Sequence, residues 1–338
     1  MNWGIIGLGH MAKNFINSLK ELENSNLTGV SSRSLLKLIK FGYRFKIKPK
    51  FLYKNYEKLL LSKDIDNIYI GTLNHTHYEL IQKCIDTGKN ILCEKPITIN
   101  LKQALDIQNK LSISKVFFLE GIAYRSHPQI SDVIRLINDG QIGKIIKIKS
   151  TFGFDSGKPK KKSRLYNKEY GGGAILDLGC YPVSMSNLLA NLNNKKDSIP
   201  EVCEVNGRMF ETGVDTEATA NLKYENNIIS EIKVSIREVL SNTTIIKGTE
   251  GEIHILDPWL PKKENIIEIH KKNEIKKIKS SSVLSLFANQ INLFEKIVQD
   301  RQEENNFHTM RIENSINCMN ILMQWKDKIL LNEKNQTK

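Results

Sequence analysis

The sequence lacks the cysteine patterns that mark disulfide frameworks and zinc sites. It has five cysteines, an odd number, and they form neither a C-x-x-C pair nor a Cys/His metal spacing: Cys84, Cys93, Cys180, Cys203 and Cys318. This usage is typical of reduced thiols in a cytoplasmic protein. It also leads us to expect no metal ion in the functional site.

Long apolar runs and targeting signals are missing as well. Residues 3–8 are apolar but too few to cross a bilayer, and the N-terminus shows neither the basic region nor the cleavage site of a signal peptide. We therefore expect a soluble, cytoplasmic protein with no membrane partner.

The composition that is present favours two globular domains. The 338 residues are 40% hydrophobic and 26% charged, which suffices for sizeable cores. The formal net charge of +13 is spread along the chain and is dense only from Lys158 to Lys162. We therefore expect no nucleic-acid partner and, at most, a mild attraction for anionic ligands.

Hydrophobic periodicity divides the chain into two regions. Short apolar runs alternate with helical patterns up to Glu120, which predicts a parallel sheet covered on both faces. Longer strand patterns follow, with one strong helix at 173–191 and two closing helices at 283–300 and 309–328. The predicted fold is α/β: a Rossmann domain over residues 1–121, then an α+β domain over 122–338 with a large, mostly antiparallel open sheet.

A glycine turn follows the first predicted strand. Gly7, Gly9 and Ala12 fit G-x-G-x-x-A, in which the glycines permit a tight turn and a close approach of pyrophosphate, and the small third residue lets helix and strand pack. The helix N-terminus adds N–H donors and a positive dipole end. The predicted phosphate-binding residues are Gly7, Leu8, Gly9, His10, Met11 and Ala12. The alternative is a packing turn that binds nothing.

The end of the second predicted strand bears on cofactor choice. An NAD site commonly has Asp or Glu there, whereas this chain has Ser31-Ser32-Arg33-Ser34. Arg33 can pair with a 2′-phosphate, with Ser32 as a further donor. We therefore predict NADP(H) over NAD(H). The alternative is a solvated loop arginine.

The tripeptide Glu94-Lys95-Pro96 follows another strand, at the sheet edge where such folds bind ligands. A lysine there places positive charge beside a nicotinamide and can bond a substrate hydroxyl.

Together with other ordered motifs, this tripeptide makes nearly the whole chain resemble the glucose–fructose oxidoreductase / inositol dehydrogenase / rhizopine catabolism (Gfo/Idh/MocA) family. The motifs are G-L-G-H-M-A at 7–12, T-L-N-H-T-H at 72–77, C-E-K-P at 93–96, E-G-I-A-Y-R-S-H-P at 120–128, I-G-K at 142–144, G-G-G-A-I-L-D-L-G-C-Y at 171–181 and G-T-E-G at 248–251.

The resemblance implies roles for three residues. Lys95 binds substrate and assists proton transfer, Asp177 matches the aspartate of the D-x-G motif, and Tyr181 stands where the family often has a histidine acid/base. Tyrosine at this position is similar to the dihydrodiol dehydrogenase, xylose dehydrogenase and glucose–fructose oxidoreductase branches. Positions four apart on an α-helix share a face, so we expect Asp177 and Tyr181 to reach one substrate. The alternative is that Tyr181 is an aromatic residue of the core and that Asp177 only begins the helix.

Further expectations concern three loops. Thr72, Asn74 and His77 match a stretch that borders the cofactor, although Leu73 replaces the usual proline and His77 is equally well a helix-start residue. Tyr124 and Arg125 are expected near the substrate, with an interdomain salt bridge as the alternative for Arg125. Residues 155–170 are interpreted as a mobile loop. Its lysines either form a solvated charge run or attract an anionic substrate.

The predicted function is reversible hydride transfer between NADP(H) and a sugar or polyol carbon, with aldose C1 oxidation preferred. The alternatives are a dehydrogenase of dihydrodiols, inositols or nucleotide-linked sugars, an enzyme that retains NADP(H) between two substrates, and an NADP(H)-binding sensor without turnover. The resemblance also implies a homodimer or homotetramer formed through the second-domain sheet.

Overall fold

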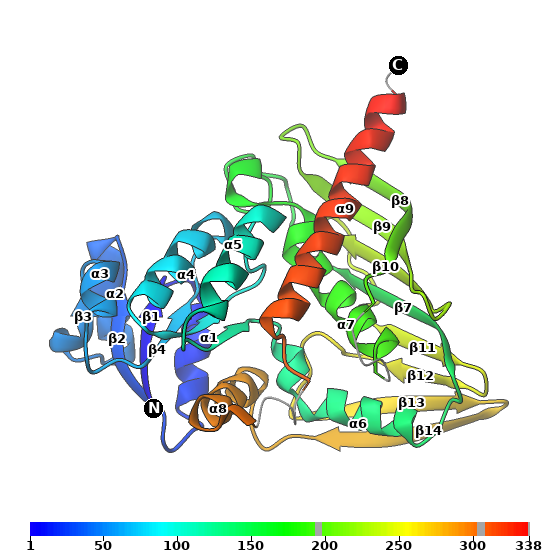
Figure 1. The fold of residues 1–338 in the computed structure, drawn as a ribbon, viewed down its shortest axis with the longest axis horizontal. Helices are drawn as coiled ribbons and strands as arrows, with labels where there is room; N and C mark the ends of the chain where they lie inside the picture. The colour runs from blue at the N-terminus through cyan, green and yellow to red at the C-terminus, as the bar shows by residue number, and fades with distance from the viewer. Residues whose placement is uncertain (193–197, 303–307, 337–338) are drawn as a thin grey trace. The chain divides into compact units, whose positions relative to one another are not determined.

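The computed structural model describes residues 1–192, 198–302 and 308–336. The chain forms two compact units (Figure 1). The first comprises Met1–Ser126 and Leu284–Ile316, and the second comprises His127–Val283 and Asn317–Lys338.

A six-stranded parallel sheet forms the centre of the first unit, in the order β3-β2-β1-β4-β5-β6. This is the strand order of a dinucleotide-binding fold, and it confirms the parallel sheet predicted from the alternating pattern. The strands are β1 (Asn2–Ile6), β2 (Asn26–Ser31), β3 (Leu52–Tyr53), β4 (Asn67–Ile70), β5 (Asn90–Cys93) and β6 (Phe118–Glu120).

Helices cover both faces of this sheet because every central strand is buried on both sides. One face is covered by α1 (His10–Leu19), α2 (Leu35–Phe45) and α8 (Leu286–Gln299). The other carries α3 (Tyr56–Leu60), α4 (His77–Asp86) and α5 (Leu101–Ser112).

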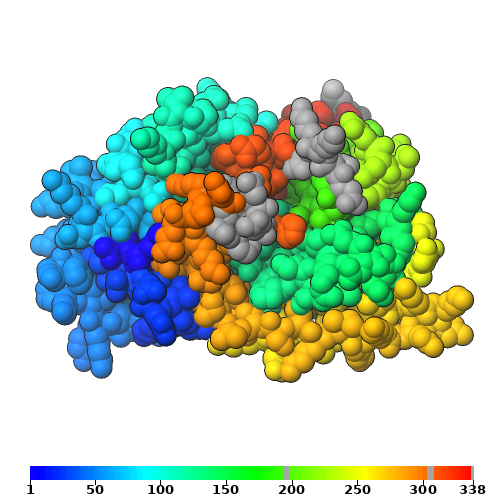
Figure 2. Space-filling model, turned by 60° about the horizontal axis from the view of Figure 1, so that its bottom comes forward, coloured from blue at the N-terminus to red at the C-terminus, as the bar shows by residue number. Residues whose placement is uncertain are grey.

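The return of α8 to the first unit differs from the expected division at residues 121 and 122. Phe294 and Ile297 of α8 pack into the same core as Trp3 and Phe15. Glu295 accepts a 2.7 Å hydrogen bond from the Trp3 indole. Figure 2 shows α8 (orange) directly beside the blue N-terminal segment. The amphipathic pattern of α8 predicts a buried face but not which sheet it covers.

An eight-stranded sheet dominates the second unit, in the order β14-β13-β12-β11-β7-β10-β9-β8. Only the β7–β10 pair is parallel among these strands, which confirms the mostly antiparallel prediction. The strands are β7 (Ile145–Gly153), β8 (Glu201–Met209), β9 (Asp215–Lys223), β10 (Ile229–Ser235), β11 (Thr244–Gly248), β12 (Glu252–Ile255), β13 (Glu264–Lys271) and β14 (Glu274–Ser281).

Helices cover one face of this second sheet (Figure 1). They are α6 (Pro128–Asn138), against β13 and β14, α7 (Cys180–Ala190), against β7 and β10, and the part of α9 (Ile312–Gln336) that belongs to this unit. In α9, the Trp325 indole donates to the Thr219 carbonyl at 2.9 Å. The opposite face carries the polar alternate positions of the strands, such as Glu231 and Lys147, which pair at 2.6 Å. Among the described residues, no helix is long and apolar enough to cross a bilayer.

Candidate active site

The glycine turn leaves β1 as the motif predicts. Gly7 has φ +92°, and a Cβ there would lie 2.6 Å from Thr72 Cγ2 and 2.7 Å from the Gly71 carbonyl oxygen. Its N–H donates to the Ser31 carbonyl at 3.2 Å. Backbone conformation and close packing therefore both require glycine at position 7.

Gly9 is different, because the fold itself does not demand a glycine there. The nearest protein atom to a Cβ at Gly9 would be the Gly71 carbonyl oxygen at 3.9 Å, and φ is an ordinary −91°. Gly9 is the N-cap residue of α1, and no side chain caps that helix end. Leu8 and Met11 are half-buried, His10 is exposed and Ala12 is buried. The missing side chain at Gly9 leaves space in front of an uncapped helix N-terminus, which suits an anionic ligand.

Arg33 lies just beyond the end of β2, with an exposed side chain. Its guanidinium carbon is 6.0 Å from the centre of the Tyr56 ring. Ser32 is buried, and its hydroxyl oxygen accepts the Ser34 N–H at 3.2 Å, while Ser34 caps α2. The arginine is thus accessible to a ligand, and the serines order the turn beneath it.

The loop after β4 carries the next predicted residues. Thr72 accepts a 2.7 Å hydrogen bond from the Thr76 hydroxyl, and Asn74 begins a short 3-10 turn. His77 begins α4 but is 0% exposed. Its Nδ1 lies 2.9 Å from the Pro96 carbonyl oxygen and its Nε2 lies 3.3 Å from the Thr72 carbonyl oxygen.

Burial lowers the pKa of His77 to about 4, so the imidazole is neutral. A neutral ring has a single N–H and donates to one carbonyl at a time, and Pro96 offers the nearer one. The structure therefore places His77 beneath the loop, where it connects two loops, and not at a surface where a cofactor would touch it.

Lys95 follows β5 in a half-buried position. The preceding Glu94 accepts a 2.7 Å hydrogen bond from the Tyr69 hydroxyl, and the bond between Lys95 and Pro96 is cis. The Tyr69–Glu94 bond and the His77–Pro96 contact hold the backbone on both sides of the lysine.

The predicted cofactor residues of the first unit thus gather at one sheet edge. Gly7, Arg33, Thr72 and Lys95 follow the carboxyl ends of β1, β2, β4 and β5, which are neighbours in the sheet. Ligands of open parallel sheets bind at this edge.

Glu120 belongs to the same edge, although we did not single it out from the sequence. It ends β6, is 2% exposed and accepts the Ile97 N–H at 2.8 Å. Burial raises the pKa of Glu120 to about 7, an effect partly offset by hydrogen bonding, which includes the Ile97 N–H, and by the positive charge of Lys95. The sequence signals were a carboxylate at the end of an apolar strand and its place as the first residue of the motif at 120–128.

Tyr124 and Arg125, expected near the substrate, are 1% and 6% exposed. Arg125 donates to two backbone carbonyls of its own unit, at 2.5 Å to His308 and 3.1 Å to Thr309. These bonds anchor the chain segment that leads into α9, and the roles predicted for Arg125 near the substrate or in an interdomain salt bridge stay predictions.

In the second unit, Asp177 lies within a π-helical turn, Ile175–Gly179, that leads directly into α7. The expectation of a regular α-helix over 173–191 is wrong at this point. The four-residue spacing from Asp177 to Tyr181 therefore does not by itself place the two side chains on one helix face. Such π turns are frequent at functional sites. Asp177 is buried, and its Oδ1 accepts a 2.7 Å bond from Arg164 Nη1, in an ion pair whose arginine is half-exposed.

Asp215 supports this turn from the first residue of β9. It is fully buried, and its Oδ2 accepts the Ile175 N–H at 2.6 Å. A Cβ on Gly173, which has φ +111°, would lie 2.5 Å from Asp215 Oδ1. Gly173 and Asp215 together therefore shape the backbone that presents Asp177, a dependence that sequence spacing does not reveal.

Tyr181 is half-buried in the first turn of α7. Its ring meets Phe152 edge-on, with centroids 5.0 Å apart, and lies 6.1 Å from the ring of Trp259. The aromatic neighbours fix the ring, yet it keeps partial exposure, which a purely structural core aromatic would not need.

Residues 155–170, predicted to be a mobile loop, make several specific contacts within their unit. Tyr166 is buried, and its hydroxyl bonds the Ser156 hydroxyl at 2.7 Å. Asp155 forms a β-bridge with Arg237. The lysines of the basic run are exposed, and Lys161 pairs with Glu211 at 2.9 Å, as in a solvated charge run.

Two family models match the chain, one in each domain. A family model described as an oxidoreductase family with an NAD-binding Rossmann fold matches residues 1–121, and the GFO/IDH/MocA C-terminal domain matches residues 130–254. The chain is 32% identical over 262 residues to a trans-1,2-dihydrobenzene-1,2-diol dehydrogenase of Xenopus tropicalis, covering 77% of this chain and 76% of the relative. The corresponding human enzyme is 30% identical over 264 residues, with the same coverage of 77% and 76%.

Solved structures share the fold. An aldose-aldose oxidoreductase from Caulobacter crescentus, complexed with glycerol, has a TM-score of 0.86 at 17% identity and covers 98% of both chains. KijD10, a 3-ketoreductase from Actinomadura kijaniata in complex with NADP and TDP-benzene, has a TM-score of 0.83 at 21% identity and covers 95% of both. With both halves matched by family models, the chain belongs to the GFO/IDH/MocA family of oxidoreductases.

Proposed function

We propose that the protein is an NADP(H)-dependent dehydrogenase or reductase that acts on a CH–OH carbon of a cyclic sugar, polyol or dihydrodiol. The observation that carries the proposal is the common sheet edge of Gly7, Arg33, Thr72 and Lys95. This edge combines a phosphate site, a cation for the adenosine ribose and a cation at the reacting end.

The residues present fit a dinucleotide. Gly9 leaves space before the uncapped N-terminus of α1, so the backbone N–H groups of the first turn suit a pyrophosphate. Arg33 is exposed, and β2 ends in serines and not in a carboxylate, so a 2′-phosphate would meet a cation and no opposing charge. These two features favour NADP(H) over NAD(H). The bound cofactor would supply or accept the hydride.

The chain's own residues bind the substrate and handle the proton. We assign to Lys95 the binding and polarisation of the reacting hydroxyl, because the Glu94–Tyr69 and His77–Pro96 contacts fix its backbone at the sheet edge. We assign the proton acceptor to Tyr181, whose ring is held by aromatic neighbours while it remains partly exposed. Asp177 is assigned to a neighbouring substrate hydroxyl, and its 2.7 Å ion pair with Arg164 orients the carboxylate.

The substrate class follows from chemistry that several relatives share. The relatives' names include oxidoreductases of aldoses and of a trans-dihydrodiol. Both substrates present a ring CH–OH beside a second hydroxyl. Two positioned hydrogen-bonding side chains, one for the reacting hydroxyl and one for its neighbour, are what such a substrate needs. Aldose C1 oxidation remains our preferred reaction, and dihydrodiol oxidation is the alternative.

The test is NADPH formation, followed at 340 nm with the full-length protein. D-xylose, D-glucose and trans-1,2-dihydrobenzene-1,2-diol are each offered with NADP⁺ and with NAD⁺. We expect turnover with at least one of these substrates and a much lower KM for NADP⁺ than for NAD⁺. Lys95→Met should abolish turnover, whereas Lys102→Met, at an exposed lysine of the same unit, should leave it unchanged.

Two outcomes would contradict the proposal. Firm NADPH binding without turnover across a broad panel would favour a cofactor sensor. Binding of neither cofactor would remove the dinucleotide reading altogether.

A further inference from the structure

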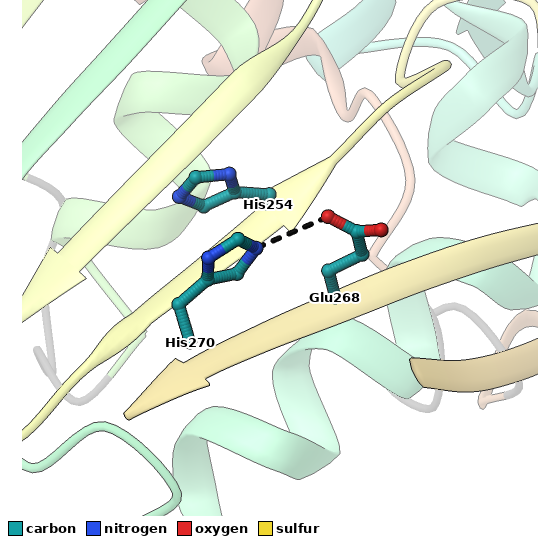
Figure 3. A group of neighbouring side chains, drawn as sticks. All are labelled: His254, Glu268 and His270. Atoms are coloured by element: carbon teal, nitrogen blue, oxygen red, sulfur yellow. Dashed lines mark hydrogen bonds and ion pairs between the residues drawn. The ribbon is translucent and has the colours of Figure 1, made fainter. Parts of the chain in front are cut away.

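A group of ionisable side chains lies on the face of the second sheet opposite its helices. His254 of β12 and Glu268 and His270 of β13 each offer one ligand atom, and these atoms all lie within 4.8 Å of one another (Figure 3). None of the three belongs to the motifs or residues assigned to hydride transfer.

The strand register brings these residues together. His254 pairs with Glu268 across the β12–β13 ladder, and His270 pairs with Glu252. Side chains two apart on a strand point to the same face, so all four share one face, while Ile253, Ile267 and Ile269 between them are buried on the other. The sequence separation of 14 residues between His254 and Glu268 is unlike a common zinc motif, which is why sequence spacing did not reveal the group.

The three side chains are held by their neighbours. His270 Nε2 lies 3.1 Å from Glu268 Oε2, as the dashed line in Figure 3 marks. The two imidazole rings stack with centroids 3.9 Å apart and an interplanar angle of 16°. Glu252 Oε2 lies 2.9 Å from His254 Nε2 and orients that ring.

We propose that His254, Glu268 and His270 form a binding site for one divalent transition-metal ion of the Zn²⁺, Cu²⁺ or Ni²⁺ class. Two imidazoles and a carboxylate are a donor set that suits these ions, whereas Ca²⁺ and Mg²⁺ prefer oxygen ligands alone. The fourth position is left for water.

The distances are compatible with an ion after small side-chain rotations. Zinc–ligand bonds of about 2.0–2.2 Å in a tetrahedron place ligand atoms roughly 3.3–3.6 Å apart. The pair His270 Nε2 and Glu268 Oε2 is already at 3.1 Å, and no ligand pair in the group exceeds 4.8 Å. Neighbouring strands of an antiparallel ladder fix the backbone, so closure needs only χ rotations of half-buried side chains.

Lys277 of β14 is the cation that competes with a metal. Its Nζ lies 3.3 Å from Glu268 Oε1, which is the other oxygen of the carboxylate, and its side chain is 66% exposed. An exposed lysine gains little from such a pair and can turn away into solvent. Oε2 therefore stays available on the side of the histidines.

The ion would connect β12 to β13 on the sheet face opposite α7, the helix that carries Tyr181, so we infer a stabilising role. Isothermal titration with Zn²⁺, on tag-free protein that has been treated with chelator, should show one saturable site per chain. Zn²⁺ should also raise the melting temperature by mass action. Cu²⁺ bound at this site should show two nitrogen ligands by electron paramagnetic resonance, and one in His270→Ala.

Substitutions distinguish Zn²⁺ binding at this site from Zn²⁺ binding elsewhere on the protein. We expect His254→Ala, His270→Ala and Glu268→Gln each to weaken Zn²⁺ binding by more than about tenfold. Lys277→Ala should leave it equal or tighter. Glu231→Gln is the matched control, because it removes a carboxylate from the same sheet but outside the group. Cys203→Ser controls for thiolate binding, because the other cysteines are buried.

The proposal fails if Zn²⁺ binds only at millimolar concentration, or if binding is equally strong in His254→Ala, His270→Ala and the unsubstituted protein. It also fails if Cys203→Ser abolishes binding. Circular dichroism of each metal-free variant guards against loss by misfolding. Should one histidine variant not fold, the Glu268→Gln and Cu²⁺ measurements still decide the question.

Discussion

The buried carboxyl of Glu120 leads to a quantitative prediction about stability and pH. Its pKa is raised from 4.5 to about 7 by burial. The folded protein therefore holds this proton more tightly than the unfolded chain does, so the contribution of Glu120 to stability is fully present below pH 4.5. It is lost progressively as the pH rises to about 7. One pKa unit corresponds to about 1.4 kcal/mol, so the full loss is on the order of 3 kcal/mol.

Glu120→Gln removes the titration but keeps a carbonyl oxygen for the Ile97 N–H. We therefore expect the free energy of unfolding of the variant, relative to the unsubstituted protein, to rise by roughly 2–3 kcal/mol between pH 5 and pH 8. Urea unfolding at several pH values measures this difference, and other titrating groups cancel because both proteins share them.

The matched control is Glu23→Gln, an exposed glutamate of the same unit. Its difference from the unsubstituted protein should stay constant over this pH range, because solvent surrounds the carboxylate in both folded and unfolded chains. A difference for Glu120→Gln that is equally flat would refute the reasoning that burial holds Glu120 protonated.

The remaining predictions concern the candidate active site. Arg33→Ala should weaken NADPH binding roughly 10- to 100-fold, the worth of a lost charge-assisted hydrogen bond, and change NADH binding little; equal losses in parallel titrations would refute the 2′-phosphate assignment. Tyr181→Phe should lower turnover by about 100-fold or more while leaving the cofactor Kd and the melting temperature nearly unchanged, and near-normal turnover would remove Tyr181 from the mechanism. Gly7→Ala should destabilise the fold by at least about 1 kcal/mol because of its positive φ and close contacts, whereas Gly9→Ala should leave stability nearly intact and weaken cofactor binding. Similar effects of the two substitutions on thermal unfolding would contradict that distinction.

Much of the first unit could be predicted from the sequence because its signals are local. A strand, a glycine turn and an amphipathic helix follow one another within residues 2–19, and the same alternation recurs up to β6. The strands β12, β13 and β14 were not predicted from the sequence. β14 in particular lacks an alternating apolar pattern, because it is charged and exposed along most of its length. The return of α8 is a packing choice between two sheets, which its own residues do not specify.

The candidate site shows the same division. Gly7, Arg33 and Lys95 follow their strands as expected, because strand ends place residues at a common sheet edge without further information. The roles of His77 and Asp215 depend on contacts with segments far along the chain. Local patterns therefore could not distinguish a buried residue that supports the backbone from a residue that contacts a ligand. The π-helical turn at Asp177 likewise has no periodicity signature.

The position of α8 has a consequence for biosynthesis. Glu295, which bonds Trp3, is made 292 residues after it. At roughly 5–20 residues per second, about 8–34 s separate the synthesis of Ser126, where the first part of the unit ends, from that of Glu295 in the helix that completes its core. During that time the surface around Trp3 and Phe15 has no permanent cover, while residues 127–283 of the second unit emerge first. The nascent chain is therefore expected to depend on a chaperone, or on provisional packing of its own, until the ribosome has passed α8.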